Sequence, residues 1–554
     1  MLQNRNLAVV FCIVFICICI STAGAAESSS GTYNVVNYGV KGDGETLNTR
    51  TINTVISECS GSGGGTVIFP AGIYVSGTIV LKSNVTLHLD NGAVIKGSGN
   101  IDHYGAGGLM RALIVINDAE NVAITGMGII DANGDAFMDM TKVKLVEPDA
   151  ADYDTKFTRQ GADYMSEKFG TEDGPVLPKD RPHPTLEINN CRNFLLRDVT
   201  IKNTPAWAIR LIDSEYADFI GFDIINDPLI PNSDGIHCTS SRIVHISDFH
   251  FEGGDDAIIV TGFGDPDKIA ENVTVSNCTL NSRSAGIRVG YGDSHIRNCV
   301  FENLVIYGSN RGLGVFVRDE GSVENILFSN ITIKTGMYKG HWWGNAEPIH
   351  VSVAPQYADT KLAHMKNIRF ANIVAESENG IVVHGWENSI IEDVVFDNIK
   401  LRITNSPIND SYGGNFDLRP THVMERAVFA HDIPGIYCTL VNGIRISDFT
   451  LEWEEPIHRF FSHGIECEDF GNLVIDGFSG RQAHVSGAGS VISLKNGKTA
   501  TIRNCFATEG AGTFLTLSNV ADQRLFVNND VANAKKAFGS GRPAFNMSGN
   551  LGAE

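Results

Sequence analysis

The chain has 554 residues, with 64 acidic against 43 basic side chains and a formal net charge of -21. Hydrophobic residues make up 43% and charged residues only 19%, which excludes a disordered chain. Nucleic acids and anionic membranes repel so negative a protein, and neither is expected as a partner. An anionic polysaccharide is compatible with this charge where the binding site is locally positive.

The first 25 residues have the pattern of a secretory signal peptide. Arg5 precedes the apolar run Leu7–Ile20, and an A-x-A cleavage site ends at Ala25. The run is too short for a comfortable membrane span. We therefore expect residues 1–25 to be removed and the protein to be exported, either secreted or periplasmic.

Residues 26–110 are expected to form an N-terminal cap and the first coils of the fold. Within them, Thr49–Cys59 predicts a short amphipathic helix, because its apolar residues follow an i, i+3, i+4, i+7 spacing. A helix at this end could cover open strand edges that would otherwise favour aggregation. The apolar residues are Ile52, Val55, Ile56 and Cys59.

Residues 111–520 carry a repeat of the form apolar-x-(Asp/Asn)-apolar-x-apolar. Each unit reads as several short alternating strands, which cannot bury their apolar faces alone but form a continuous core when stacked. Leucine-rich repeats would need a leucine ladder, and propeller blades roughly 40 residues. The predicted fold is therefore all-β, a right-handed single-stranded parallel β-helix. The units end at Ile201, Ile225, Phe251, Leu280, Ile306, Ile333, Ala375, Leu401 and Leu451.

A polar, partly acidic segment interrupts the strand pattern at about residues 134–184. We expect it to be a long, partly helical loop that leans over one wall of a groove. Together with loops near 340–360 and 405–435, it would close the ends of that groove. This favours exo over endo action but leaves both open. Residues 521–554 are expected to be a weaker C-terminal cap or tail.

The densest polar segments are NSDGIH, which contains Asp234, and GGDDAI, which contains Asp255 and Asp256. Asp234 and Asp255 are close to one repeat apart, and parallel strands of neighbouring coils lie about 4.7–4.9 Å apart. Their carboxylates can therefore stack side by side. Asp255 and Asp256 would point to opposite faces of a regular strand, and Gly253-Gly254 supply the backbone freedom to bring both to one face.

Three acids crowded together cannot all ionise easily, so the pKa of one of them should rise. An acid beside a base is what glycosidic hydrolysis requires. An isolated Asp of this kind more often caps a turn or binds calcium, but two such motifs one coil apart favour catalysis.

Six further segments occur in an order typical of one family. They are VNYGVKGDG at 36–44, GGTVIFPAG at 64–72, Arg181-Pro182, NTPAW at 203–207, NSDG at 232–235 and GDD at 254–256. Over about residues 33–335 the chain resembles the polygalacturonase family, family 28 of the glycoside hydrolases. The resemblance implies that Asp255 is the general acid, that Asp234 and Asp256 activate the attacking water, and that the anomeric centre is inverted. Carboxylates about 5 Å apart would by the general rule favour retention, so inversion rests on the resemblance alone.

The chain also departs from the family pattern. It reads Ser284-Ala285-Gly286 in place of Gly-His-Gly and Phe316-Val317-Arg318 in place of Arg-Ile-Lys. The family residues missing here position a galacturonate carboxylate. The glycan therefore stays open between galacturonate-containing pectin, which is the first expectation, and rhamnogalacturonan or a sulfated galactan.

Other side chains are candidates for binding this substrate. Arg288 and Arg318 fall at matching places on successive coils, and each could pair with a carboxylate or sulfate in a bidentate manner. With Arg181 they would form a local positive patch beside the three aspartates. Trp342 and Trp343 lie in a Gly-flanked loop and suit stacking on a sugar ring, with only one of them expected to be buried. The histidines His237 and His350 could orient hydroxyls, although a single histidine is more often structural.

Two other functions are weighed against hydrolysis. A lyase or epimerase would use calcium and a basic residue, and the acid-rich site lacks an obvious basic partner. A non-catalytic carbohydrate-binding solenoid is also compatible with the fold, but retention of all three aspartates argues against it.

The cysteines do not suggest a metal site. No CxxC pair or His/Cys cluster has zinc spacing, so no metal or cofactor is expected. Cys278, Cys299 and Cys505 recur in similar contexts and are expected to be buried at equivalent repeat positions.

Overall fold

The computed structural model describes residues 31–552, except 106, 107, 109, 146–152, 264–266, 294, 487, 488, 522, 523 and 540–545. The predicted signal peptide lies outside the described residues. Within the described part, no helix is long and apolar enough to cross a membrane.

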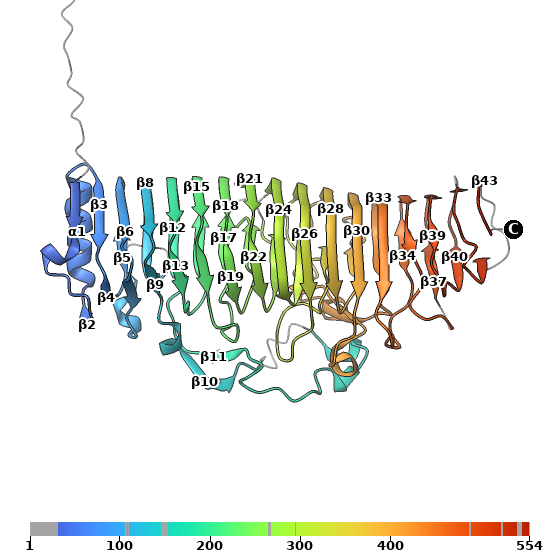
Figure 1. Ribbon diagram of the computed structural model, residues 1–554, viewed down its shortest axis with the longest axis horizontal. Helices are drawn as coiled ribbons and strands as arrows, with labels where there is room; N and C mark the ends of the chain where they lie inside the picture. The colour runs from blue at the N-terminus through green and yellow to red at the C-terminus, as the bar shows by residue number, and fades with distance from the viewer. Residues whose placement is uncertain are drawn as a thin grey trace, which may run out of the picture.

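The chain forms a right-handed parallel β-helix, as predicted from the repeat (Figure 1). One large sheet of 39 strands winds along the axis, and each strand pairs in parallel with strands of the coils before and after it. The strands fall into three stacks that run along the axis. Long strands bend from one stack into the next, so β8, β12 and β33 contribute to two stacks or more.

The first stack carries the predicted site residues. Its strands are β5 (Ile79–Leu81), β8 (Ile114–Gly126), β12 (Leu186–Arg197), β14 (Ile209–Ile212), β17 (Ile236–Thr239), β20 (Ile258–Thr261), β23 (Ala285–Gly290), β25 (Arg311–Val317), β27 (Ile349–Val353), β29 (Ile381–His384), β33 (Ile436–Trp453), β34 (Ile465–Phe470), β37 (Ser490–Lys495), β40 (Thr513–Ser518) and β42 (Lys536–Phe538).

The second and third stacks close the solenoid. The second adds β1 (Gly31–Asn34), β3 (Gly65–Phe69), β6 (Val85–Leu89), β15 (Glu215–Ile220), β18 (Arg242–Ser247), β21 (Ile269–Ser276), β24 (His295–Ser309), β26 (Val323–Thr335), β28 (Met365–Ser377), β30 (Ile391–Ile403), β35 (Asn472–Asp476), β38 (Thr499–Arg503), β41 (Arg524–Val527) and β43 (Asn546–Ser548). The third adds β2 (Asp43–Leu47), β4 (Gly72–Ser76), β7 (Ala93–Gly97), β9 (Ile129–Asp131), β13 (Thr200–Lys202), β16 (Asp223–Ile225), β19 (His250–Gly253), β22 (Thr279–Ser282), β36 (Ser479–Gly480) and β39 (Phe506–Ala507).

The repeated Asp or Asn of the sequence motif marks the bend between the second and third stacks. In eight of the nine units this residue has a positive φ, and in the remaining unit Gly221 takes its place with φ 61°. Asp and Asn tolerate this left-handed conformation better than other side chains. The eight residues are Asp198, Asp248, Asn277, Asn303, Asn330, Asn372, Asn398 and Asp448.

The core is filled by the apolar residues that alternate along these strands. Its aromatic part includes a stack of four phenylalanines, with ring centroids 4.9 to 5.2 Å apart from one coil to the next. All eight cysteines of the described part are free and buried. The prediction that Cys278 and Cys299 occupy equivalent positions is wrong, because Cys299 pairs in register with Val273.

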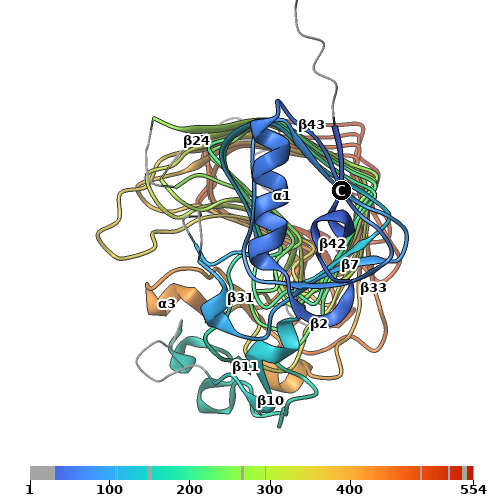
Figure 2. The ribbon, with the colours of Figure 1, turned by 90° about the vertical axis from the view of Figure 1, so that its left-hand side faces the viewer.

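The two ends differ. The helix α1 (Thr49–Gly61) forms where it was predicted, with all four of its apolar residues buried, and lies across the N-terminal end of the solenoid (Figure 2). At the other end, β41 and β43 still pair in parallel with the coils before them. The stacks thus continue beyond residue 520, into the segment expected to be a weaker cap or tail.

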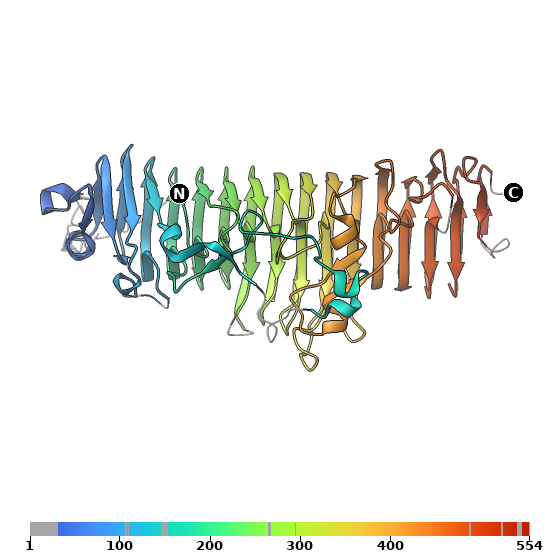
Figure 3. The same cartoon turned by 90° about the horizontal axis from the view of Figure 1, so that it is seen from below.

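The predicted insertion meets a second loop far away in the sequence. Within 134–184, β10 (Met138–Val143) pairs antiparallel with β11 (Val176–Pro178), and the helical parts among its described residues are three short 3-10 turns. The loop at 405–435 contains α2 (Asn409–Tyr412), β31 (Asn415–Asp417), α3 (Met424–Ala427) and β32 (Val428–Ala430). Figure 3, which views the molecule from below, shows the two lying together in front of the strands. The 3-10 turns of the insertion are η3 (Gly134–Phe137), η5 (Thr155–Phe157) and η6 (Gly161–Asp163), whereas η1 (Val35–Tyr38) and η2 (Ile101–His103) precede it.

Hydrogen bonds fix this contact. Arg159 Nη2 is 2.6 Å from Asp432 Oδ1, and the Arg159 amide donates to Asn415 Oδ1 at 2.7 Å. Gln160 donates to the carbonyl of Gly413 at 2.8 Å. The insertion therefore runs along the axis, contacts the 405–435 loop of coils far from the one it leaves, and returns to β11 beside β10.

Candidate active site

Three carboxylates meet at the amino ends of two neighbouring strands of the first stack. Asp234 precedes β17, and Asp255 and Asp256 precede β20. Each offers an oxygen, and these oxygens lie within 4.8 Å of one another. The chain thus brings together the three acids predicted from the sequence.

Gly253 and Gly254, which precede Asp255 and Asp256, leave no room for a side chain. A Cβ at Gly254 would lie 2.1 Å from the Ile230 carbonyl oxygen, and a Cβ at Gly253 would lie 2.6 Å from the Ser233 carbonyl oxygen. Neither glycine has a positive φ. They allow the turn before β17 to pack closely against the turn before β20, which brings the two acidic turns into contact.

Asp256 is buried and held by several donors. Its Oδ1 accepts hydrogen bonds from the Ser284 hydroxyl at 2.6 Å and the Ala285 amide at 2.8 Å. Its Oδ2 lies 3.1 Å from Arg288 Nε. These groups stabilise a negative charge on Asp256. Ser284 and Ala285 belong to the segment that replaces the family's Gly-His-Gly, so the changed segment still supports the acids.

Asp234 is buried against two aromatic rings. Its Oδ2 lies 3.0 Å from His237 Nε2, and the His237 ring stacks on Trp207 with centroids 3.7 Å apart. Burial, and then the charge of Arg288, hold the pKa of His237 well below its usual range. Asp234 Oδ1 is buried and has no hydrogen-bond partner among the described residues.

Asp255 is the half-buried member of the three. Burial, followed by repulsion from Asp234 and Asp256, raises its pKa well above the usual value for aspartate. Burial and the charge of Asp256 also raise the pKa of Asp234. The crowding therefore favours a protonated carboxyl at Asp255 or Asp234 over full ionisation of the group.

Arg181 lies beside these acids, as expected. It donates to the carbonyls of Pro205 and Pro231 and to Asn232 Oδ1, and the Asn232 amide is 3.5 Å from Asp255 Oδ2. Burial lowers the pKa of Arg181 to about 10, while the charges of the nearby aspartates act in the opposite direction. It supplies positive charge to the site and fixes the turn before Asp234.

The prediction that Arg288 and Arg318 occupy matching positions on successive coils is wrong. Arg288 pairs in register with Gly314, and Arg318 lies four residues further along. Arg318 is 0% exposed and donates to the carbonyls of Leu418 and Pro420 and to Ser352. Burial lowers its pKa to about 9. Arg318 therefore anchors the 405–435 loop and does not reach a substrate, whereas Arg288 stays at the acids.

The prediction that His350 orients substrate hydroxyls is also wrong, because this side chain is buried as well. It lies in the first stack but is fully buried, with its Nε2 2.8 Å from Ser352 Oγ. Burial, and then the charges of Arg311 and Arg318, hold its pKa well below the usual range. The groups packed around it belong to the structural network beneath the 405–435 loop, so it does not orient substrate hydroxyls.

The two tryptophans divide as predicted, one buried and one half-exposed. Trp342 is 5% exposed, and its Nε1 donates to the Asp173 carbonyl of the insertion at 3.1 Å. Trp343 is half-exposed. Only Trp343 is therefore open for stacking on a sugar, and Trp342 packs the insertion against the solenoid.

Arg210, on a strand next to the acids, was not predicted as a site residue. Arg210 is half-buried and pairs in register with His237 on the neighbouring strand. The spacing of one coil between the two positions could have revealed it, because residues one coil apart lie side by side on the same face.

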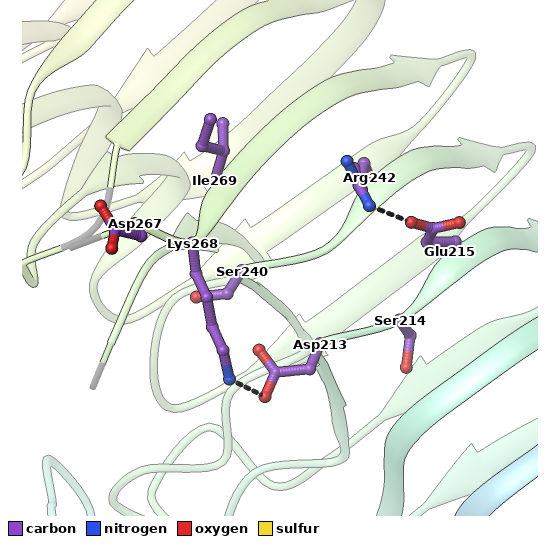
Figure 4. A pocket seen from close by; sticks show the side chains of 8 residues that line it. All are labelled: Asp213, Ser214, Glu215, Ser240, Arg242, Asp267, Lys268 and Ile269. Carbon is purple, nitrogen blue, oxygen red and sulfur yellow. Dashed lines mark hydrogen bonds and ion pairs between the residues drawn. The ribbon is translucent and has the colours of Figure 1, made fainter. Parts of the chain in front are cut away.

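A separate pocket of about 260 Å³ lies at the carboxyl ends of β14 and β17, beside Asp213 and Ser240 (Figure 4). Lys268 Nζ is 2.6 Å from Asp213 Oδ2, and Arg242 is ion-paired with Glu215. Its cations are thus matched by acids. The acids described above precede these strands, so this pocket lies at their opposite ends.

A long parallel β-helix with clustered carboxylates beside arginine and tryptophan defines a class of carbohydrate-active proteins. The comparisons identify the family: the model described as glycosyl hydrolases family 28 matches residues 59–412, which is more than half of the chain. The chain belongs to this family and is a glycosidase.

Individual relatives are distant. The chain is 26% identical to a "Probable polygalacturonase" of Vitis vinifera, over 62% of this chain and 68% of that one. It is also 26% identical to an "Exo-poly-alpha-D-galacturonosidase" of Dickeya chrysanthemi, over 54% and 55%.

Two solved structures share the fold. An exopolygalacturonase from Thermotoga maritima has a TM-score of 0.52 and 22% identity, over 67% of this chain and 87% of that one. A family 28 exopolygalacturonase from Yersinia enterocolitica has a TM-score of 0.55 and 18% identity, over 84% and 78%.

Proposed function

We propose that the protein is an exported, polygalacturonase-like hydrolase that cleaves glycosidic bonds in galacturonate-containing pectin or its oligosaccharides. The observation that carries this proposal is the group of three carboxylates whose oxygens lie within 4.8 Å of one another. It supports a reaction in which one carboxyl donates a proton and another accepts one.

In this mechanism Asp255 is the general acid. Its raised pKa favours the protonated form, and as the half-buried member of the group it is the one a glycosidic oxygen can reach. Proton transfer from Asp255 to the leaving oxygen breaks the bond to the anomeric carbon.

Asp234 and Asp256 act on water. Asp256 accepts a hydrogen bond from Ser284 and is paired with Arg288. Oδ2 of Asp234 is held by His237, while its buried Oδ1 has no hydrogen-bond partner among the described residues, and we assign Oδ1 to bind the attacking water. Attack by this water on the face opposite the leaving group inverts the anomeric centre.

We further propose exo action. The 405–435 loop is tied to β25, the strand next to the one that carries Arg288, through Arg311 and through Arg318 directly after it. The insertion joins this loop through Arg159. A groove closed near the acids favours a chain end over the middle of a polymer. The predicted signal peptide supports action outside the cytoplasm. Because the protein is negative overall, an anionic substrate needs the local positive charge of the arginines at the site.

Product analysis tests these proposals together. Purified protein is incubated with polygalacturonate, rhamnogalacturonan and sulfated galactan, and the initial products are followed by NMR. A hydrolase on pectin releases saturated products, and inversion is shown when the first anomer to appear has the configuration opposite to that of the cleaved linkage. Exo action releases short products while the remaining polymer stays long. An unsaturated product would indicate a lyase, and no cleavage of any uronate polymer would refute the proposed function. Chelation of divalent cations is expected to leave hydrolysis unchanged.

A further inference from the structure

Asn310 lies on the same edge of the first stack as the three acids. Asp256 precedes β20, Ser284 precedes β23 and Asn310 precedes β25, so the three occupy turns of successive coils. These turns are joined directly, because the Ser284 hydroxyl donates to Asp256 and the Arg311 amide donates to the Ser284 carbonyl at 2.9 Å. The turn that carries Asn310 is therefore continuous with the wall that supports the acids.

All the hydrogen bonds that the Asn310 side chain makes with described residues go to the loop that carries Trp343. Its Nδ2 donates to the carbonyl of Trp343 at 3.0 Å and to that of Gly344 at 3.1 Å. Its Oδ1 accepts from the amide of Ala346 at 3.3 Å. Asn310 is buried, so solvent does not compete for these three bonds. They tie the loop to the turn before β25.

A buried ion pair of the 405–435 loop holds the same segment. Asp417 Oδ2 accepts from the Gly344 amide at 2.7 Å, and Arg419 Nη2 donates to the Trp342 carbonyl at 2.9 Å. Arg419 also donates to both oxygens of Asp417, from Nε at 2.9 Å and from Nη2 at 2.6 Å. Together with Asn310, this pair fixes both peptide groups that flank Trp343.

The side chain of Trp343 is left open by the protein. It is half-exposed, whereas its neighbour Trp342 is buried against the insertion. Among the described residues, the Trp343 indole has no hydrogen-bond partner and no aromatic or cationic side chain over its ring. A ring carried on a fixed main chain loses little freedom when a ligand covers it, which favours binding. The apolar face of a sugar ring suits such a surface.

Trp343 lies at some distance from the acids along the stack. Its loop is tied to the turn before β25 and leads into β27, which are two and three strands beyond β20. At 4.7–4.9 Å per strand this is about 9–15 Å. Trp343 is thus too far away to contact the bond that is cleaved, but a sugar further along the same chain can reach it. This is the side on which the 405–435 loop closes the groove, so that sugar lies at or near the end of the substrate.

We propose that Asn310 is a positioning residue, which holds Trp343 so that its ring stacks on the apolar face of a sugar beyond the cleaved bond. Stacking on a ring face does not depend on the charge of the sugar. The contact therefore serves free and methyl-esterified galacturonate equally, unlike the arginines at the acids. This inference rests on the proposed hydrolase function and concerns binding, not bond cleavage.

The test is a double-mutant cycle of Asn310→Ala, Trp343→Ala and the two combined, on oligogalacturonates and on their methyl esters. Each single change is expected to raise KM by about three- to tenfold, as the loss of an aromatic stacking contact does, with little change in kcat. The factor should be the same for free acids and esters. The combined variant should have the KM of Trp343→Ala, because Asn310 then has no indole to position.

Asn529→Ala in the distal coils is the matched control. Asn529 is also buried and hydrogen-bonded to the main chain, since it accepts from the Cys505 amide at 3.0 Å and donates to the Ile502 carbonyl at 3.1 Å. Its replacement should lower the melting temperature and leave KM at the wild-type value. A loss of buried hydrogen bonds is thereby separated from a loss of sugar binding.

A folded Asn310→Ala protein with wild-type KM overturns the proposal. So does a combined variant in which the two KM factors multiply, because the residues then act independently, and so does a KM rise confined to the free acids. Melting curves establish folding. Should the alanine variant fail to fold, Asn310→Ser decides, since its shorter hydroxyl cannot reach both carbonyls and an unchanged KM there also overturns the proposal. Wild-type protein that cleaves no uronate polymer would overturn the proposed function together with this inference, whereas an active enzyme with a multiplicative cycle overturns the inference alone.

Discussion

Asp255→Asn separates catalysis from folding. The asparagine has nearly the same shape, and its carbonyl oxygen can still accept the hydrogen bond that the Asp256 amide donates to Asp255 at 2.9 Å. What it lacks is the proton that burial and the two neighbouring carboxylates retain on Asp255. General acids contribute about 10²- to 10⁴-fold to rate, so kcat should fall by that factor.

The stability of the Asp255→Asn protein should rise or stay unchanged. Asp255 lies beside two other carboxylates, and asparagine cannot ionise, so it brings no third charge into this group at any pH. We therefore expect a melting temperature equal to or above that of the wild type. The assay is the initial rate of reducing-end release from polygalacturonate, measured beside thermal melts. Asp397→Asn, on the exposed surface of β30, is the matched control. Near-normal turnover in a folded Asp255→Asn protein would refute the general-acid assignment.

The other predictions concern the loops and the distal coils. Trp343→Ala should raise KM and leave the melting temperature unchanged, whereas Trp342→Ala should cost about 3–5 kcal/mol of stability, as large-to-small changes of buried aromatic residues do; equal effects of the two on KM would contradict this division. Arg318→Ala should expose the 405–435 loop to limited proteolysis before any loss of the solenoid, and resistance equal to wild type would show that Arg318 is not its anchor. Burial, followed by Glu468 and Asp432, raises the pKa of Glu466 from 4.5 to about 7. Its folded form therefore favours the proton, and stability present at low pH is lost as pH rises from about 4.5 through 7. Glu466→Gln should be up to about 3 kcal/mol more stable than wild type above this window and equal to it below, with the figure reduced by solvent screening; a difference independent of pH in paired melts would reject the pKa assignment.

The features that depend on local pattern could be predicted from the sequence. The repeat gave the β-helix because its Asp and Asn residues, such as Asn330, occupy the left-handed bends that the fold requires once per coil. The acids were found because Asp234 and Asp255 are nearly one coil apart, so that strand pairing alone places them side by side.

Residues covered by distant segments could not be assigned in the same way. Arg318 and His350 have the chemistry of ligand-binding residues, but both are fully buried, and Arg318 is hydrogen-bonded to the 405–435 loop. Trp342 is buried by Asp173 of the insertion, which lies 169 positions away. No local pattern encodes these contacts, because they depend on where two long loops come to rest. Arg210 was missed although it lies one coil, 27 residues, before His237 and pairs with it in register.

The contact between the insertion and the 405–435 loop also bears on how the molecule unfolds. In a solenoid each coil touches only its neighbours, so stability is a sum of local terms and coils can fray one after another from an end. Arg159 and Gln160 instead bond residues more than 250 positions away. The coils between them cannot separate without breaking this tie, so we expect the middle of the molecule, including the acids, to open as a single cooperative block while the terminal coils fray independently.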